Sequence, residues 1–182
     1  MDALPQRPSQ TDGGIARRFG TGFFGGKFLP LHKGHEHCIA LAASECARVY
    51  VVMFHGGAEE RAILRETPPG KARLLSFAAR KAQLDRMARK YGNVIAAAID
   101  ISGLILENGE DDWDAETPLV RRLIPGPIDA VYGSEASYRA YVARAYPEAV
   151  YRRVDPNRTV VPISATELRG MQSEEEMERW LA

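Results

Sequence analysis

The stretch FGTGFFGGKFLPLHKGHEH, from Phe19 to His37, decides how the chain is interpreted. Its apolar, glycine-rich first half predicts a β-strand, and its second half leads into a segment of helical character. Two nucleotide-binding patterns overlap in it: G-x-G-x-x-G begins at Gly20, and H-x-G-H begins at His32. The two patterns place a phosphate group at different points of the chain, so the residues around each pattern must decide between them.

The glycine pattern has the spacing of a dinucleotide-binding turn but not its surroundings. In such a turn the glycines leave a strand and a helix starts at once, which directs its amides at a pyrophosphate. Here the glycines alternate with Thr21, Phe23 and Phe24 and so lie inside the expected strand, and Lys27 to Pro30 separate them from any helix. A P-loop needs a hydroxyl residue after its lysine, where this chain has Phe28. We interpret the glycines as a strand end that lets a ligand or another segment approach the backbone.

The H-x-G-H pattern has surroundings that suit an anion site. Pro30 excludes a helix interior before it, Gly34 allows close backbone approach, and His35 falls in the first turn of the next helix. We therefore expect His32 and His35 beside free amide groups at the positive end of a helix dipole. Two alternatives remain: a metal site that includes His37, and surface histidines without a role.

The composition bounds the class of protein. The chain has 182 residues, with 24 Lys and Arg against 24 Asp and Glu, so no broad electrostatic argument favours a nucleic-acid or membrane partner. It has no apolar run near the twenty residues of a membrane span, and we expect a cytoplasmic protein. Residues 1–18 are expected to form a disordered tail and residues 19–182 a single domain. Cys38 and Cys46 are expected to be buried structural thiols.

Strand-like and helix-like segments alternate along the chain. The apolar run RVYVVMF, from Arg48 to Phe54, suits a strand covered on both faces of a parallel sheet. The alternation predicts an α/β fold with a doubly wound, mainly parallel sheet, which binds ligands beyond the carboxyl ends of its strands where the strand order reverses. The other expected elements are helices at 39–47, 71–91, 119–124 and 138–145, strands at 93–101, 128–133 and 149–154, an irregular acidic loop at 108–118, and a last helical segment from 164.

A second motif, VDPNRTVVPISATELR, runs from Val154 to Arg169. Ser164, followed three residues later by Glu167, is a capping box that predicts the start of a helix. The hydroxyls of Ser164 and Thr166, together with Arg169 one turn later, can hold the same anion as the H-x-G-H histidines. The alternative is a plainly capped helix with a solvated arginine.

These two motifs in this order resemble the nucleotidylyltransferase superfamily, a Rossmann-like fold in which both segments hold a nucleoside triphosphate. Within it, the chain most resembles the nicotinamide-mononucleotide adenylyltransferase domain of the bifunctional bacterial NAD-salvage proteins. The likeness runs from Phe19 to Gly170 and is carried by GKFLPLHKGH, Trp113, VYGSE and the second motif. Lys33 departs from the family's hydroxyl residue and adds positive charge beside the phosphates. Those proteins commonly carry a C-terminal kinase domain, and some carry an N-terminal DNA-binding domain. Here thirteen residues follow Arg169 and no P-loop is present, so neither the kinase nor the repressor activity is carried over as an expectation.

The resemblance implies a reaction and a set of residues. The substrates would be ATP and nicotinamide mononucleotide, and the products would be NAD and pyrophosphate. Mg²⁺ would be bound to the ATP phosphates, with no metal ligands from the protein. Another acceptor, such as phosphopantetheine or flavin mononucleotide, and a non-catalytic nucleotide-binding module remain alternatives, and a homo-oligomer is left open. Trp113 would stack on the nicotinamide ring or anchor a loop, and Arg158 would contact phosphate or pair with Asp155. The implied catalytic residues are Lys27, His32, His35 and Arg169, and the implied ATP-binding residues are Gly26, Phe28, Gly34, Gly133, Ser134, Arg158, Ser164 and Thr166.

Overall fold

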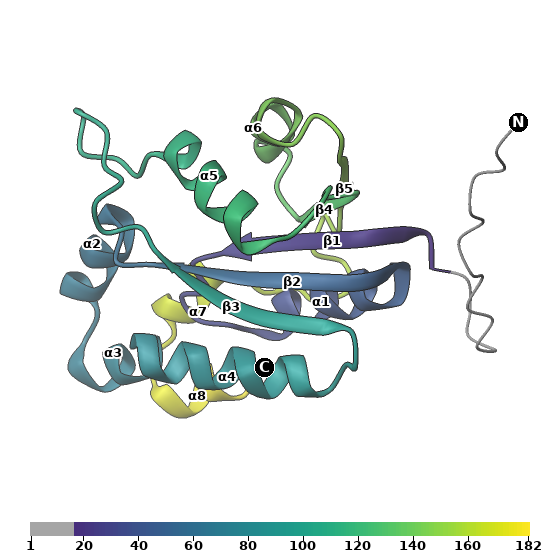
Figure 1. Ribbon diagram of the computed structural model, residues 1–182. Coiled ribbons are helices and arrows are strands. Elements are labelled where there is room, and N and C mark those ends of the chain that lie inside the picture. Colours follow the sequence, from purple (N-terminus) through teal and green to yellow (C-terminus); the bar gives the residue numbers. More distant parts are fainter. Residues whose placement is uncertain (1–16) are drawn as a thin grey trace, which may run out of the picture.

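The computed structural model describes residues 17–182, so most of the tail expected at 1–18 lies outside the described residues. Its centre is a five-stranded parallel sheet with the strand order β3-β2-β1-β4-β5 (Figure 1). No helix in residues 17–182 is both long and apolar enough to cross a membrane. The strands are β1 (Phe19–Gly26), β2 (Cys46–His55), β3 (Val94–Asp100), β4 (Ala130–Gly133) and β5 (Val150–Arg153). The helices are α1 (Lys33–Glu45), α2 (Ala58–Glu66), α3 (Pro69–Leu75), α4 (Phe77–Arg89), α5 (Trp113–Leu123), α6 (Tyr138–Ala145), α7 (Ala165–Gly170) and α8 (Glu174–Glu178).

Helices cover both faces of this sheet, which explains the continuous apolar run in β2. Val49, Val51 and Met53 point to the layer of α1 and α4, where they pack in one buried cluster with residues such as Ile39. The alternate residues of β2 pack in a second cluster on the side of α5 and α6, which includes Val120. Figure 1 shows α5 and α6 above the sheet and α1, α3 and α4 below it. Successive side chains of a strand point to opposite faces, so a strand between two helical layers is apolar at every position.

The glycines of β1 lie inside the strand, as expected, and allow close packing there. A Cβ atom at Gly22 would stand 2.6 Å from the Cys46 sulfur, and one at Gly25 would stand 2.7 Å from the ring of Phe54. Cys38 and Cys46 are both buried and unbridged. The G-x-G-x-x-G spacing therefore reflects packing within the sheet and not a phosphate-binding turn.

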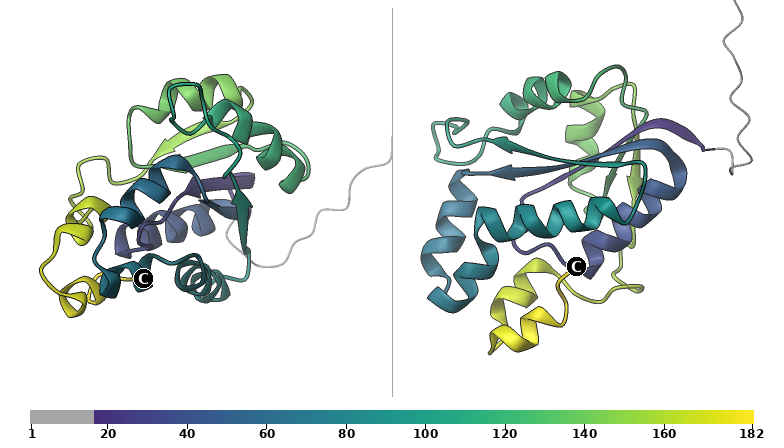
Figure 2. Two further views of the ribbon diagram at one scale, coloured as in Figure 1. Left: turned by 90° about the vertical axis from the view of Figure 1, so that its left-hand side faces the viewer. Right: turned by 60° about the horizontal axis from the view of Figure 1, so that its bottom comes forward.

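Several helix boundaries differ from those expected. The long helix expected at 71–91 is divided at Ser76, whose extended backbone ends α3 and whose hydroxyl accepts from Ala79 N to cap α4. The expected acidic loop at 108–118 is shorter, because the Asp112 carboxylate caps α5 and the helix begins at Trp113. Helices α2 and α8 were not expected. Both are short, and α8 packs through Met177 against Leu74 and Leu168, on the side of the sheet that carries α3 and α4 (Figure 2).

Candidate functional site

A cavity of about 410 Å³ opens at the carboxyl ends of β1 and β4. β1 pairs with β2 on one side and with β4 on the other, so the order of strands reverses at this point. This is where doubly wound sheets bind ligands, and the sequence predicted the site at this edge. All of the residues given a role from the sequence line the cavity: Gly26, Lys27, Phe28, His32, Gly34, His35, Trp113, Gly133, Ser134, Arg158, Ser164, Thr166 and Arg169.

The two histidines of H-x-G-H are oriented by hydrogen bonds at the start of α1. His32 is the N-cap residue, and its Nδ1 accepts from Gly34 N at 3.1 Å. The Nδ1 of His35 accepts from His32 N at 3.3 Å, and the two rings lie 3.8 Å apart between centroids. An imidazole nitrogen that accepts a hydrogen bond carries no hydrogen, so the neutral form of each ring carries its proton on Nε2. Each ring therefore has an Nε2–H group free to donate.

The protein environment keeps both imidazoles neutral. Burial, together with the positive charge of Arg158, lowers the pKa of His32 to about 4. Burial lowers the pKa of His35 well below its ordinary value, and His32 and Arg158 lower it further. At neutral pH the pair consequently offers two uncharged N–H donors, and the positive charge of the site comes from its arginines.

The first-turn amides of α1 are less available than the sequence suggested. Lys33 N donates to Trp180 O at 3.0 Å, Gly34 N donates to His32, and Glu36 N donates to His32 O at 3.0 Å. The expectation of free amides beside the histidines is therefore wrong for these three groups. The Lys33 ammonium lies 5.6 Å from the centre of the Trp180 ring, so its charge faces the C-terminal segment and does not line the cavity.

The second motif starts α7 with the predicted capping box and connects to the first motif. Ser164 Oγ accepts from Glu167 N at 3.1 Å, while the Glu167 carboxylate accepts from Ser164 N at 2.7 Å. Arg169 Nη1 donates to Leu29 O at 2.7 Å across 140 residues of sequence, and its Nη2 donates to Thr166 Oγ1 at 3.1 Å. Arg169 thus joins α7 to the loop that leads into H-x-G-H.

Lys27 is already paired with two carboxylates. Its ammonium lies 2.5 Å from Glu59 Oε2 and 3.0 Å from Asp111 Oδ2. Burial alone would lower the pKa of Lys27, but the hydrogen bonds and charges of the two acids outweigh it and raise the pKa. The Glu59 side chain is 62% exposed and the Asp111 side chain 3%, so Glu59 is the partner that can leave the lysine more easily.

Arg158 faces the cavity, and its partner differs from the one considered in the sequence. Its Nη2 donates to Glu135 Oε1 at 3.0 Å, and its Nη1 donates to Ile163 O at 3.0 Å. Asp155 instead accepts from the backbone amides of residues 159–161 and holds the loop in place. The pairing of Arg158 with Asp155 is therefore wrong.

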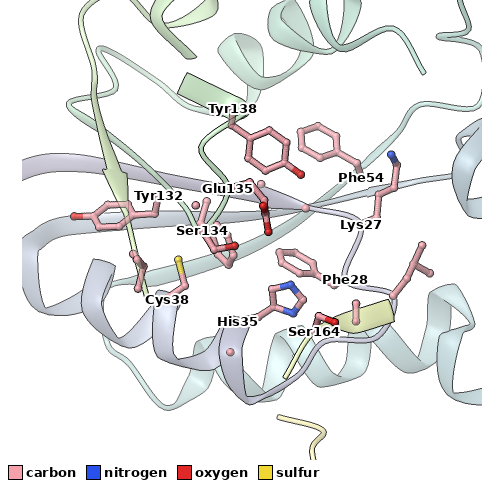
Figure 3. Close-up of a pocket in the computed structure, with 18 of the residues that line it drawn as sticks. Lys27, Phe28, His35, Cys38, Phe54, Tyr132, Ser134, Glu135, Tyr138 and Ser164 are labelled. Carbon is pink, nitrogen blue, oxygen red and sulfur yellow. The ribbon is translucent and has the colours of Figure 1, made fainter. Parts of the chain in front are cut away.

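Opposite the histidines, aromatic side chains form the other end of the cavity. The Trp113 ring lies 5.3 Å from Tyr138 and 5.6 Å from Tyr141 between centroids, and Trp113 is 39% exposed. Glu116, one turn further along α5, also lines the cavity. We call Trp113, Glu116, Tyr138 and Tyr141 the aromatic half, and His32, His35, Ser164, Thr166 and Arg169 the polar half. In Figure 3, His35 and Ser164 lie together on one side of the cavity and Tyr138 lies on the other.

Solved structures with the same arrangement of strands and helices place the chain among known folds. No protein-family model and no curated protein sequence matches the chain. The NadR protein in complex with NAD and AMP-PNP is 22% identical over 85% of this chain, with a TM-score of 0.58. A bifunctional NMN adenylyltransferase/ADP ribose pyrophosphatase from Francisella tularensis is 21% identical over 89% of this chain, with a TM-score of 0.59. The chain has their fold.

This likeness confirms the expected fold. It also agrees with the expected Rossmann-like, doubly wound sheet. The chain spans 43% of the NadR chain and 44% of the Francisella chain, so the likeness concerns less than half of each of those proteins.

Sequence reasoning gave no role to five residues that line the cavity: Glu59, Glu116, Glu135, Tyr138 and Tyr141. It also missed Asp111, which pairs with Lys27 from outside the cavity lining. Two of these residues had a local signal: Glu116 shares a helix face with the candidate Trp113, and Glu135 follows the candidate Ser134 in VYGSE. The others come from α2, α6 and the loop before α5, and contacts between distant segments bring them to the cavity or to Lys27. The described residues hold no group of three or more His, Cys, Asp or Glu placed to bind a metal ion.

Proposed function

We propose that the chain is an adenylyltransferase that joins ATP to nicotinamide mononucleotide, forming NAD and releasing pyrophosphate. The observation that carries the proposal is the meeting of two distant motifs at one cavity, where Arg169 binds Leu29 O and two oriented imidazoles face the same space. The fold is shared with an NMN adenylyltransferase and with NadR, which binds NAD and AMP-PNP, and this supports the assignment.

The chemistry requires positioning and charge neutralisation. A phosphate oxygen of the mononucleotide attacks the α-phosphorus of ATP, a new P–O bond forms, and the bond from the α-phosphorus to the bridging oxygen breaks. The electrons of that bond leave with pyrophosphate. The nucleophile is already an anion at neutral pH, so no strong general base is needed. Holding the reactants in line and stabilising the developing charge provide the catalysis.

The polar half supplies donors of the right kind. The Nε2–H groups of His32 and His35 donate to phosphate oxygens, and such preorganised donors are most effective where charge develops in a site shielded from water. Arg169 and Arg158 provide fixed positive charge, and the hydroxyls of Ser164 and Thr166 add further hydrogen bonds. Mg²⁺ enters with ATP as part of the substrate and keeps phosphate oxygens and water as its main ligands. The Francisella enzyme has also been solved with AMP and a manganese ion, which fits a metal-nucleotide substrate.

Lys27 joins the reacting phosphates by exchanging partners. In the described structure Glu59 and Asp111 neutralise it, and Glu59 is the more exposed of the two acids. A phosphate oxygen that approaches Lys27 replaces Glu59, whose carboxylate then returns to water at little cost. Asp111 stays in place, because it also accepts from Ala58 N at 2.6 Å at the start of α2.

The aromatic half receives the pyridine ring. Trp113 is exposed enough to offer a ring face, and Tyr138 and Tyr141 support it edge-on. A cationic pyridinium ring is a favourable partner for an indole face.

The test is an acceptor panel. The protein is incubated with Mg-ATP and, in separate reactions, nicotinamide mononucleotide, nicotinate mononucleotide, phosphopantetheine or flavin mononucleotide, and pyrophosphate is measured. The proposal expects release with a pyridine mononucleotide at a rate well above that with the other two acceptors. Pyrophosphate release with phosphopantetheine or flavin mononucleotide alone would identify that compound, and not a pyridine mononucleotide, as the acceptor. No release from a folded protein that binds ATP would favour the non-catalytic module.

A further inference from the structure

Glu116 is a buried acid that has no partner of its own. Its side chain lines the aromatic half of the cavity, and the residue is only 7% exposed. Within residues 17–182, its carboxyl makes no hydrogen bond to a side chain or amide and no ion pair within 4 Å. The carboxyl oxygens of Glu116 are not fully enclosed, unlike the unpaired oxygens of Gln83 and Tyr146, so they are accessible from the cavity. A carboxyl held in this way inside a cavity points to a ligand that supplies the missing donor.

The groups around Glu116 place its pKa near neutral pH. Burial raises the pKa of Glu116 to about 7; Lys27 at the end of β1 opposes this rise, and Asp111 and Asp112 in the loop before α5 add to it. From α6, the phenol of Tyr141 faces the same space and is itself affected by the Glu116 charge. Lys27 is the cation of this group, and two other carboxylates already pair with it. No free cation of the described residues is therefore placed to neutralise a second anion beside Glu116.

We infer that Glu116 recognises the carboxamide of the pyridine ring and excludes the carboxylate of the acid mononucleotide. The inference rests on the proposed function and adds the residue that chooses between the two pyridine substrates. Trp113 and Glu116 stand three residues apart on α5 and line the same cavity, so a ring stacked on the indole presents its edge to the carboxyl.

The two substrates differ in what they offer to Glu116. The amide substituent carries N–H donors, and the Glu116 carboxyl accepts from them whether it is ionised or neutral. The acid substituent is ionised near neutral pH and only accepts hydrogen bonds. It meets repulsion from the ionised form of Glu116, and only the neutral form of Glu116 donates to it. Preference for the amide should therefore increase as Glu116 loses its proton.

The experiment compares kcat/KM for nicotinamide and nicotinate mononucleotide, with Mg-ATP, from pH 6 to pH 8. The ratio of the two values cancels everything common to both substrates, including phosphate ionisation and the positive charge of the ring. A group with a pKa of about 7 goes from roughly 90% to roughly 10% neutral over this range, so the amide-to-acid ratio should rise about tenfold. Because kcat/KM reports ionisation of the free enzyme, the kcat/KM for the acid relative to that for the amide should fall to half of its low-pH value near pH 7.

Two variants locate the effect. Glu116→Gln keeps the shape and removes the charge, and it should lose the pH dependence and accept the acid at least about tenfold better at pH 8. Asp114→Asn removes a charge from the same helix but outside the cavity, where the Asp114 side chain is 65% exposed and pairs with Arg144. This control should keep the wild-type ratio and its pH dependence.

The outcomes separate the inference from the proposed function. Turnover with a flat wild-type ratio, or with the same ratio in Glu116→Gln, overturns the role of Glu116 and leaves the adenylyltransferase intact. The wild-type pH series needs no variant, so the test stands even if Glu116→Gln folds poorly. If neither mononucleotide yields pyrophosphate, the proposed function fails. Calorimetric binding of the two mononucleotides then decides the inference, and equal affinities at pH 8 would contradict it.

Discussion

Lowering the pH from 8 to 5 should destabilise the fold through His32. Burial and Arg158 lower the pKa of this N-cap imidazole from 6.5 to about 4 in the folded protein. The unfolded chain therefore binds a proton first as the pH falls, and folding stability is lost between about pH 6.5 and pH 4. For these two pKa values the loss between pH 8 and pH 5 is about 2 kcal/mol, and it approaches roughly 3 kcal/mol below pH 4.

The matched variant is His32→Asn. Asparagine is a good N-cap residue, so the start of α1 is retained while the titrating group is removed. The free energy of unfolding is measured by urea denaturation, followed by circular dichroism, at pH 8 and pH 5 for both proteins. Other titrating groups remain in both proteins and largely cancel in the comparison. His35 loses the contribution of His32 in the variant, but burial, the main cause of its lowered pKa, is retained. The wild type should lose about 2 kcal/mol more than the variant. Equal losses would refute the buried, neutral state of His32.

Two further predictions concern the site, and a third concerns the buried ion pair between Glu60 of α2 and Arg80 of α4. Trp113→Ala should raise KM for the mononucleotide about tenfold and leave KM for ATP nearly unchanged, since the indole face supports only the ring; equal increases would indicate a loop anchor. Arg169→Lys should lower kcat about tenfold or more with an unchanged circular dichroism spectrum, because a lysine cannot bind Leu29 O and Thr166 together while facing phosphate. Normal turnover of the variant would exclude a role for the Arg169 guanidinium in binding phosphate. Glu60→Ala should lower the free energy of unfolding by about 3–5 kcal/mol, because Arg80 would lose its counter-charge. Arg80 is fully buried and also donates to Lys27 O, so it cannot move to solvent. A loss under about 1 kcal/mol would contradict this prediction.

The parts of the site that could be predicted from the sequence depend on neighbours in the chain. The capping box at Ser164, the helix that begins beside His32 and the doubly covered strand β2 each follow from residues within a few positions of one another. The position of the cavity followed as well, because the carboxyl ends of parallel strands meet at one edge of a sheet.

The remaining features depend on contacts between distant segments. Lys27 carries the charge that the motif suggests, but Glu59, 32 residues later, and Asp111 neutralise it. The first-turn amide of Lys33 is bound by Trp180 at the other end of the chain. Such pairings are decided by how loops and terminal helices fold back on the sheet. The early start of α5 is different, because Asp112 is a local N-cap signal that the acidic surroundings concealed.

The most direct test of the account measures NAD and pyrophosphate together in a reaction with Mg-ATP and nicotinamide mononucleotide. The wild-type protein should form the two products in equal amounts. The His35→Ala variant, with an unchanged circular dichroism spectrum, should form both at least about a hundredfold more slowly. A folded wild-type protein that forms no NAD, or a His35→Ala variant that releases pyrophosphate at nearly the wild-type rate, would contradict the account.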